Sequence, residues 1–197
     1  LSSRRNGVSR LHGAVSREMW QVIWPDAPAD EAPITHITNG VHLRTWVAAE
    51  TEALYTRYVG ERWNDATDEL QWHRANHIPH AELWAARTRQ RERLVNDVRL
   101  ALAAQVARRG GDPAWTLGAL DPDALTIVFA RRFATYKRAV RLLSQEERLY
   151  RLLTGNRKLQ FVFAGKAHPR DEPGKAALQR IHQFAGRPEL RGSFVFL

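Results

Sequence analysis

Two clusters of basic residues stand directly after two short apolar runs in the last part of the sequence. The first cluster, residues 131–138 (RRFATYKR), follows the run 125–130 (LTIVFA). The second cluster, residues 165–168 (GKAH), follows the run 159–164 (LQFVFA). Arginine offers phosphate a planar, bidentate fork, and lysine offers a compact positive charge. These residue types therefore point to the binding of an anion such as phosphate.

The apolar runs must be strands if they are to bring the two clusters together. A third run, residues 193–197 (SFVFL), follows them, and helical stretches at about 136–153 and 173–185 lie between the runs. This alternation predicts an α/β fold with a parallel sheet of right-handed βαβ units. Ligands of such sheets bind at the carboxyl ends of the strands, where helices begin and where Gly165 would let a ligand approach the backbone.

The sequence before these strands divides into a turn-rich and a helical part. Residues 1–46 contain two Asn-Gly pairs and three prolines, which predicts loops. Residues 47–120 read as helical, and Pro79 and Gly110-Gly111 are expected to bound a long helix. The apolar stripe expected on that helix consists of Leu83, Leu94, Val98, Leu102 and Val106. We therefore expect three parts, with the Rossmann-like sheet in residues 121–197.

Composition limits the class of protein. The 197 residues are 44% hydrophobic and 26% charged, which is typical of a globular chain. The absence of cysteine excludes a disulfide scaffold and favours a cytoplasmic location, and no apolar run approaches the ~20 residues of a membrane helix. Because the chain begins at Leu1 and stops at Leu197 inside an apolar run, we expect it to be a piece of a longer protein.

No metal is expected in this protein. His73, His77 and His80 have a spacing that could suit a metal ion. However, Pro79 interrupts the helix that would align them, and no glutamate completes an HExxH motif. We therefore expect these histidines to have structural or surface roles.

The net charge of +9 is distributed unevenly. Residues 1–120 hold 15 basic and 14 acidic side chains, whereas residues 121–197 hold 15 basic and 7 acidic ones. This excess indicates an anionic partner and leaves a nucleic-acid-binding module open as an alternative. Against that module, the cations do not form one helix face, and no aromatic residues alternate with them. We therefore expect a small anion rather than a nucleic acid.

Four blocks of the sequence, in order, resemble motifs of the α-glucan phosphorylases. Residues 6–12 (NGVSRLH) resemble the NGV-x-x-(L/I)-H loop of this family, and residues 38–46 (TNGVHLRTW) resemble its TNG-(I/V)-x-x-R-x-W block. Residues 131–138 resemble its KRxxxYKR signature, and residues 164–169 (AGKAHP) resemble GGKA-x-P. The resemblance implies a fragment of a two-domain enzyme of the GT-B glycosyltransferase architecture, in a bacterial subgroup of the family.

The resemblance also implies roles for individual residues. Arg132 and Lys137 would be the catalytic pair that holds the attacking phosphate. The glucosyl unit would be contacted by Val8, Asn39 and Tyr136. The phosphates of substrate and cofactor would be bound by Arg131, Arg132, Lys137, Gly165 and Lys166. Arg131 stands where the family usually has a lysine, which keeps the charge and changes its geometry.

The implied activity transfers a terminal glucosyl unit from an α-1,4-glucan to inorganic phosphate, which gives glucose 1-phosphate. The family uses pyridoxal phosphate, whose lysine lies in a Gly-rich block further towards the C-terminus. None of the four lysines of this chain has that setting, so we expect the chain alone to be inactive. A homodimer is left open, and a nucleotide-sugar glycosyltransferase of the glycogen synthase type is the alternative enzyme.

Overall fold

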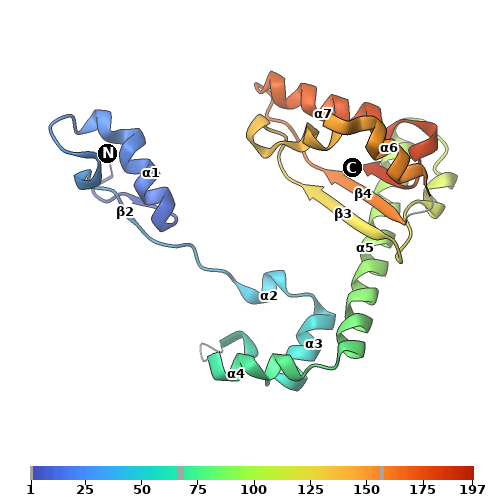
Figure 1. Cartoon of the computed structure of the whole chain (residues 1–197), viewed down its shortest axis with the longest axis horizontal. Coiled ribbons are helices and arrows are strands. Elements are labelled where there is room, and N and C mark those ends of the chain that lie inside the picture. Colours follow the sequence, from blue (N-terminus) through green and yellow to red (C-terminus); the bar gives the residue numbers. More distant parts are fainter. Residues whose placement is uncertain (1, 66–68, 156–157) are drawn as a thin grey trace. The chain divides into compact units, whose positions relative to one another are not determined.

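The computed structural model describes residues 2–65, 69–155 and 158–197 of the chain. It divides into two units, Leu1–Val47 and Ala48–Leu197, both of which are drawn in Figure 1. The first unit contains both Asn-Gly pairs, and the second contains both cationic clusters.

The first unit is built on a short parallel strand pair with a helix packed against it. Its elements are β1 (Asn6–Gly7), α1 (Arg10–Trp20), β2 (Thr35–His36) and α2 (Leu43–Trp46). Ser9 caps the N-terminus of α1, since its hydroxyl accepts a hydrogen bond from the His12 N–H. The helix lies close to β1, since a Cβ atom on Gly7 would be only 2.4 Å from the backbone nitrogen of Gly13. Residues 1–46, for which the sequence predicts loops, thus also contain a helix of 11 residues.

The second unit contains a three-stranded sheet. Its elements are α3 (Ala49–Tyr58), α4 (Glu69–His73), α5 (His80–Arg108), β3 (Leu125–Ala130), α6 (Glu146–Thr154), β4 (Leu159–Ala164), α7 (Glu172–Ala185) and β5 (Phe194–Phe196). The strands are parallel and β4 is central. Ile127 pairs with Phe161, which in turn pairs with Phe194. The α/β class and the parallel order expected from the three apolar runs are confirmed.

Helices cover both faces of this sheet (Figure 1). Phe161 and Phe163 of β4 belong to a core that includes residues of α6 and α7. Val162, between them, belongs to a second core with Val98 and Leu102 of α5. Successive side chains of a strand point to opposite faces, so a strand that is apolar throughout needs a helical layer on each side. The strand β4, which is apolar apart from Gln160, has such a layer on each side.

Helix α5 begins after Pro79 and ends before Gly110, as expected, but its buried stripe differs from the expected one. Leu83 and Leu94 are 43% and 38% exposed, whereas the buried positions are Ala86, Val95, Val98 and Leu102. The reason is that the two halves of α5 pack on different neighbours: Ala86 joins a core with α3, and the later positions join the sheet. In the described parts of the chain, no helix is long and apolar enough to cross a membrane.

The helical stretch expected at 136–153 is not one continuous helix. It consists of two 3₁₀ helices, η6 (Thr135–Lys137) and η7 (Ala139–Gln145), followed by α6. Arg138 separates the two 3₁₀ helices because its backbone is left-handed, with φ of +56°. A right-handed helix cannot run through such a residue.

Candidate phosphate-binding site

The loops that follow β3 and β4 lie side by side at the carboxyl edge of the sheet. The backbone N–H of Phe133 donates a hydrogen bond to the carbonyl oxygen of Lys166 at 2.9 Å. Phe133 and Ala167 also form a parallel bridge, which continues the pairing of the two strands beyond their ends. The two cationic clusters identified in the sequence are therefore neighbours in space.

Gly165 occupies a position where no other residue fits without a shift of the backbone. Its φ is +153°, which L-residues rarely adopt. A Cβ atom at this position would lie 2.1 Å from the carbonyl oxygen of Arg131. The backbone of the second cluster thus passes directly against that of the first.

Exposed basic side chains dominate these loops. Arg131, Arg132 and Lys166 are exposed, and among the described residues none of the three takes part in an ion pair. Lys137 is half-buried, with its Nζ 4.7 Å from the centre of the Tyr136 ring, and Tyr136 itself is 67% exposed. An uncompensated positive cluster that holds both arginine and lysine is suited to a multivalent anion.

Helix ends contribute less to this site than the sequence predicts. The first cluster contains η6, which has only three residues and therefore a small dipole. The N-terminus of α7 is already occupied by its own carboxylate, because Oδ1 of Asp171 accepts a hydrogen bond from the Gly174 N–H at 2.8 Å. The positive charge at this edge therefore comes from side chains.

The two glucosyl-contact candidates of the first unit also lie together. The backbone N–H of Asn39 donates to the carbonyl oxygen of Val8 at 3.1 Å. This bond continues the β1–β2 pairing, since the N–H of Ile37 donates to the carbonyl oxygen of Gly7. Both Val8 and Asn39 are exposed, and the Val8 N–H donates to Nδ1 of His12. The resemblance of residues 6–12 and 38–46 to the family motifs, and not a cavity, makes this surface a candidate contact for a sugar.

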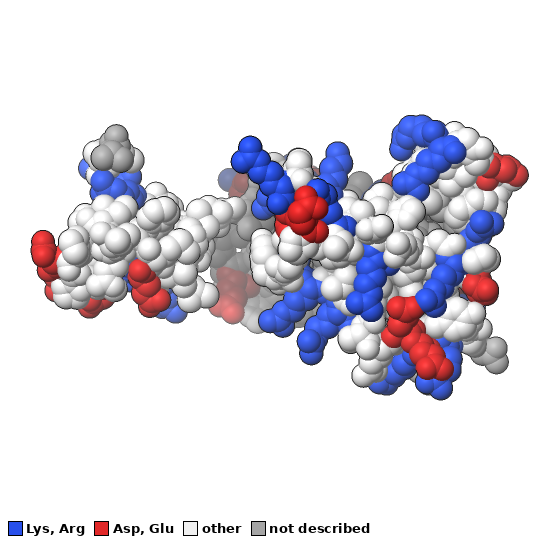
Figure 2. Space-filling model, turned by 90° about the horizontal axis from the view of Figure 1, so that it is seen from above, with Lys and Arg blue, Asp and Glu red and all other residues white. Residues whose placement is uncertain are grey.

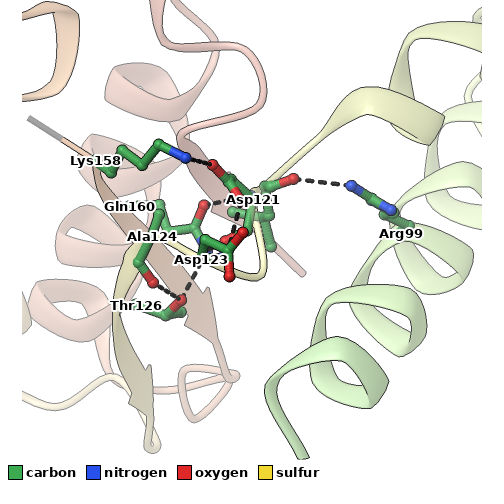
Figure 3. Close-up of polar contacts among 8 residues, drawn as sticks. Arg99, Asp121, Asp123, Ala124, Thr126, Lys158 and Gln160 are labelled. Carbon is green, nitrogen blue, oxygen red and sulfur yellow. Dashed lines mark hydrogen bonds and ion pairs between the residues drawn. The ribbon is translucent and has the colours of Figure 1, made fainter. Parts of the chain in front are cut away.

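A polar network that sequence reasoning missed fixes the opposite, amino edge of the sheet (Figure 3). Gln160 is only 2% exposed, and its amide donates to the Asp121 carbonyl oxygen and to Oγ1 of Thr126, at 2.9 and 2.7 Å. Its oxygen accepts from the Asp121 N–H at 2.7 Å. From α5, Arg99 donates to the carbonyl oxygens of Ala119 and Leu120. The sequence signals this network only by the polar Gln160 within the otherwise apolar run 159–164.

Asp121 is the charged member of this network. Hydrogen bonding from the backbone of Asp123 and the ion pair with Lys158, at 2.9 Å, hold the pKa of Asp121 below its ordinary value. The same ion pair raises the pKa of Lys158. Lys158 therefore acts at the amino edge of the sheet, away from the cationic clusters at the carboxyl edge.

The histidines with a metal-like spacing do not form a metal site in the structure. His73 ends α4, His77 ends a 3₁₀ helix and His80 begins α5. Across residues 2–65, 69–155 and 158–197, no group of three or more His, Asp or Glu side chains is arranged to hold a metal ion.

Curated relatives cover the whole chain, although no protein-family model matches it. The maltodextrin phosphorylase of Thermococcus litoralis is 39% identical over 196 residues, which is 98% of this chain and 23% of that protein. The glycogen phosphorylase of Mycobacterium tuberculosis is 41% identical over 201 residues, or 100% of this chain and 23% of that protein. The glycogen phosphorylase of Aquifex aeolicus is 36% identical over 202 residues, or 100% of this chain and 29% of that protein.

The parallel sheet, its cationic carboxyl edge and these relatives place the chain among the GT-B glycosyltransferases. Within that class, the chain belongs to the α-glucan phosphorylase family. It spans about a quarter of the length of the curated relatives that it matches, 23% for the first of them. The resemblance read from the four sequence blocks is thereby confirmed.

Proposed function

We propose that this chain forms the phosphate-binding edge, and part of the sugar-binding surface, of an enzyme that transfers a terminal glucosyl unit from an α-1,4-glucan to inorganic phosphate. The observation that carries the proposal is the contact between the two loops, in which the Phe133 N–H bonds to the Lys166 carbonyl oxygen. That contact supports a single site for the cations of both loops. The names of the relatives, maltodextrin and glycogen phosphorylase, support the same reaction.

The chemistry requires phosphate to be held close to the anomeric carbon of the glucosyl unit. Arg132 would bind two phosphate oxygens with its planar fork, and Lys137 would add a charge whose position the Tyr136 ring restricts. A phosphate oxygen then forms a bond to the anomeric carbon while the glycosidic bond breaks, and the leaving oxygen takes up the proton that the hydrogen phosphate carried. Fixed cations lower the barrier because they need no reorganisation as charge develops.

The residues present also fit the phosphate group of pyridoxal phosphate. Gly165 lets its backbone lie directly against the Arg131 carbonyl oxygen, and Arg131 and Lys166 are exposed cations on either side of that contact. We propose that these three residues hold the cofactor phosphate. When bound, the cofactor would supply a second phosphate near the attacking one, which accounts for the number of cations. Among the other lysines, Lys158 and Lys175 are paired with Asp121 and Glu172.

The distribution of charge favours a small anion over a nucleic acid. Figure 2 shows basic side chains dispersed over one face of the molecule, with acidic side chains among them. A nucleic-acid-binding surface would gather its cations in a continuous patch or stripe. The local excess at the two loops comes instead from a few exposed side chains of two adjacent loops, which suits a small anion.

Kinetics of an active phosphorylase that carries this segment would test the proposal. Arg132→Ala should lower kcat/KM for phosphate by at least about a hundredfold and change KM for the glucan little, because one charge-assisted contact to the reacting group is lost. Arg132→Lys should also be impaired, since a point charge does not replace a bidentate fork. Arg151→Ala, at an exposed arginine of α6, is the matched control. Glucosyl transfer from a nucleotide sugar without any need for phosphate would contradict the proposal.

A further inference from the structure

Phe133 lies at the centre of the two cationic loops although it carries no charge. In residues 131–138, all of which the structure describes, Phe133 is the one buried side chain, with 1% of it exposed. Its neighbour Arg132 is exposed. Because the backbone is paired like a strand at this point, successive side chains alternate, so the burial of one favours the exposure of the next.

Four elements meet on this residue. The Phe133 ring packs 5.6 Å from the ring of Phe129 in β3 and 5.9 Å from that of Phe196 in β5, measured between ring centroids. Its N–H bonds to the loop after β4 at Lys166. At the start of α7, a Cβ atom on Gly174 would lie 2.5 Å from the Phe133 carbonyl oxygen. The ring thus packs on two strands, the N–H is hydrogen-bonded to the loop after β4, and the carbonyl oxygen lies close to the start of α7.

We propose that Phe133 is a positioning residue, which fixes the two phosphate-binding loops relative to each other and so sets where Arg132 and Lys166 present their charges. This inference rests on the proposed function, because it concerns the same phosphate site. Arginine and lysine side chains are flexible, so their backbones must be held if a small anion is to meet both at once. Phe133 supplies that restraint through burial and backbone pairing.

The consequence is a specific dependence of phosphate affinity on an apolar residue. A shift of about 1 Å in a binding group can cost as much as a hundredfold in activity, even when the change is made away from the chemistry. Replacement of Phe133 by a smaller side chain would leave the charge of the site unaltered. Its effect on phosphate binding would therefore report geometry and not electrostatics.

The test is a titration of the full 197-residue chain with inorganic phosphate, followed by NMR of the backbone amides. Phe133→Leu should weaken phosphate binding about tenfold and change the amide shifts of residues 165–168, with faster hydrogen exchange at residue 133. Phe161→Leu is the matched control, because Phe161 is 3% exposed in the same core but lies within β4. That control should lose stability and keep phosphate affinity within about twofold.

The outcomes separate this inference from the proposed function. No phosphate response around residues 131–138 and 165–168 in the unsubstituted chain would contradict the proposed site. In that event, the amide shifts and hydrogen exchange of the ligand-free variants still test whether Phe133 fixes the two loops relative to each other. The inference is overturned if Phe133→Leu leaves those amides unaltered, or if Phe161→Leu weakens phosphate binding as much as Phe133→Leu does. Phe133→Met, which keeps most of the side-chain volume, should restore affinity relative to Phe133→Ala.

Discussion

The carbonyl oxygen of Arg131 lies where a side chain on Gly165 would have to begin. This contact joins two positions that are far apart in the sequence, and it brings two separate loops to one edge of the sheet. The geometry follows from the in-register parallel pairing of β3 and β4, in which Ala130 lies opposite Ala164. Each loop leaves its strand at the same level, so the next residues of both loops are in contact.

Gly165→Ala should therefore damage both stability and phosphate binding. The new Cβ atom would lie 2.1 Å from the Arg131 oxygen, and the φ of +153° is strained for alanine. We expect a loss of at least about 2 kcal/mol in the free energy of unfolding, measured by urea denaturation. Gly118→Ala is the control, because nothing lies within 4 Å of its Cβ position, and its effect should stay within about 0.5 kcal/mol. Equal effects of the two substitutions would refute the close contact.

Gln160→Leu should destabilise the chain although it adds an apolar residue to an apolar strand. The substitution leaves the backbone N–H and carbonyl of Asp121 and the hydroxyl of Thr126 without the Gln160 amide. We expect a loss of about 2–3 kcal/mol in urea denaturation, since unsatisfied polar groups at a buried site cost more than the added apolar contact returns. Gln183→Leu, at an exposed position of α7, is the matched control and should change little. A neutral Gln160→Leu would mean that water replaces the amide.

The pH dependence of stability should contain a contribution from Asp121. Its pKa is lower in the folded chain than its ordinary value, chiefly because of the hydrogen bond from Asp123 and then because of Lys158. A carboxylate with a lowered folded pKa stabilises the fold above its unfolded pKa of about 4, and that stabilisation is lost as the pH falls through the folded value. Asp121→Asn should remove this contribution, so its stability should fall less steeply below about pH 4 in urea denaturation at a series of pH values. An unchanged pH profile would show that neither the hydrogen bond from Asp123 nor the ion pair with Lys158 lowers the pKa of Asp121 in solution.

The outer edge of β3 should promote self-association of the chain. Leu125, Ile127 and Val128 are 66%, 43% and 46% exposed, and β3 is the end strand of the sheet in the described part of the chain. The strand has neither a charged residue nor a proline, which are the usual protections of an edge strand. Sedimentation velocity should show association that rises with concentration and that Val128→Lys reduces.

Leu100→Lys is the comparison for that experiment, since Leu100 is 71% exposed on α5 and lies outside the sheet. It should leave the association largely intact. If both substitutions reduce association equally, general surface hydrophobicity is responsible and not the strand edge.

The sequence by itself determined the elements that local patterns encode. Runs of apolar residues that alternate with helical stretches indicated three parallel strands, and Pro79 and Gly110 indicated the ends of a long helix. The cationic clusters were visible because they follow the strands directly. Each of these features depends on neighbouring residues and on a fixed period, so no knowledge of distant contacts was needed.

Tertiary structure decided which side chains those elements bury and which backbones touch. Leu94 fits the apolar period of α5 and is still 38% exposed, because the helix changes its packing partner along its length. Arg138 has a left-handed backbone, which interrupts a helical pattern. An arginine in the sequence does not predict such a conformation. The roles of Phe133 and Gln160 depend on contacts with residues more than thirty positions away. Such contacts form only when the strands pair, and periodicity along one segment cannot report them.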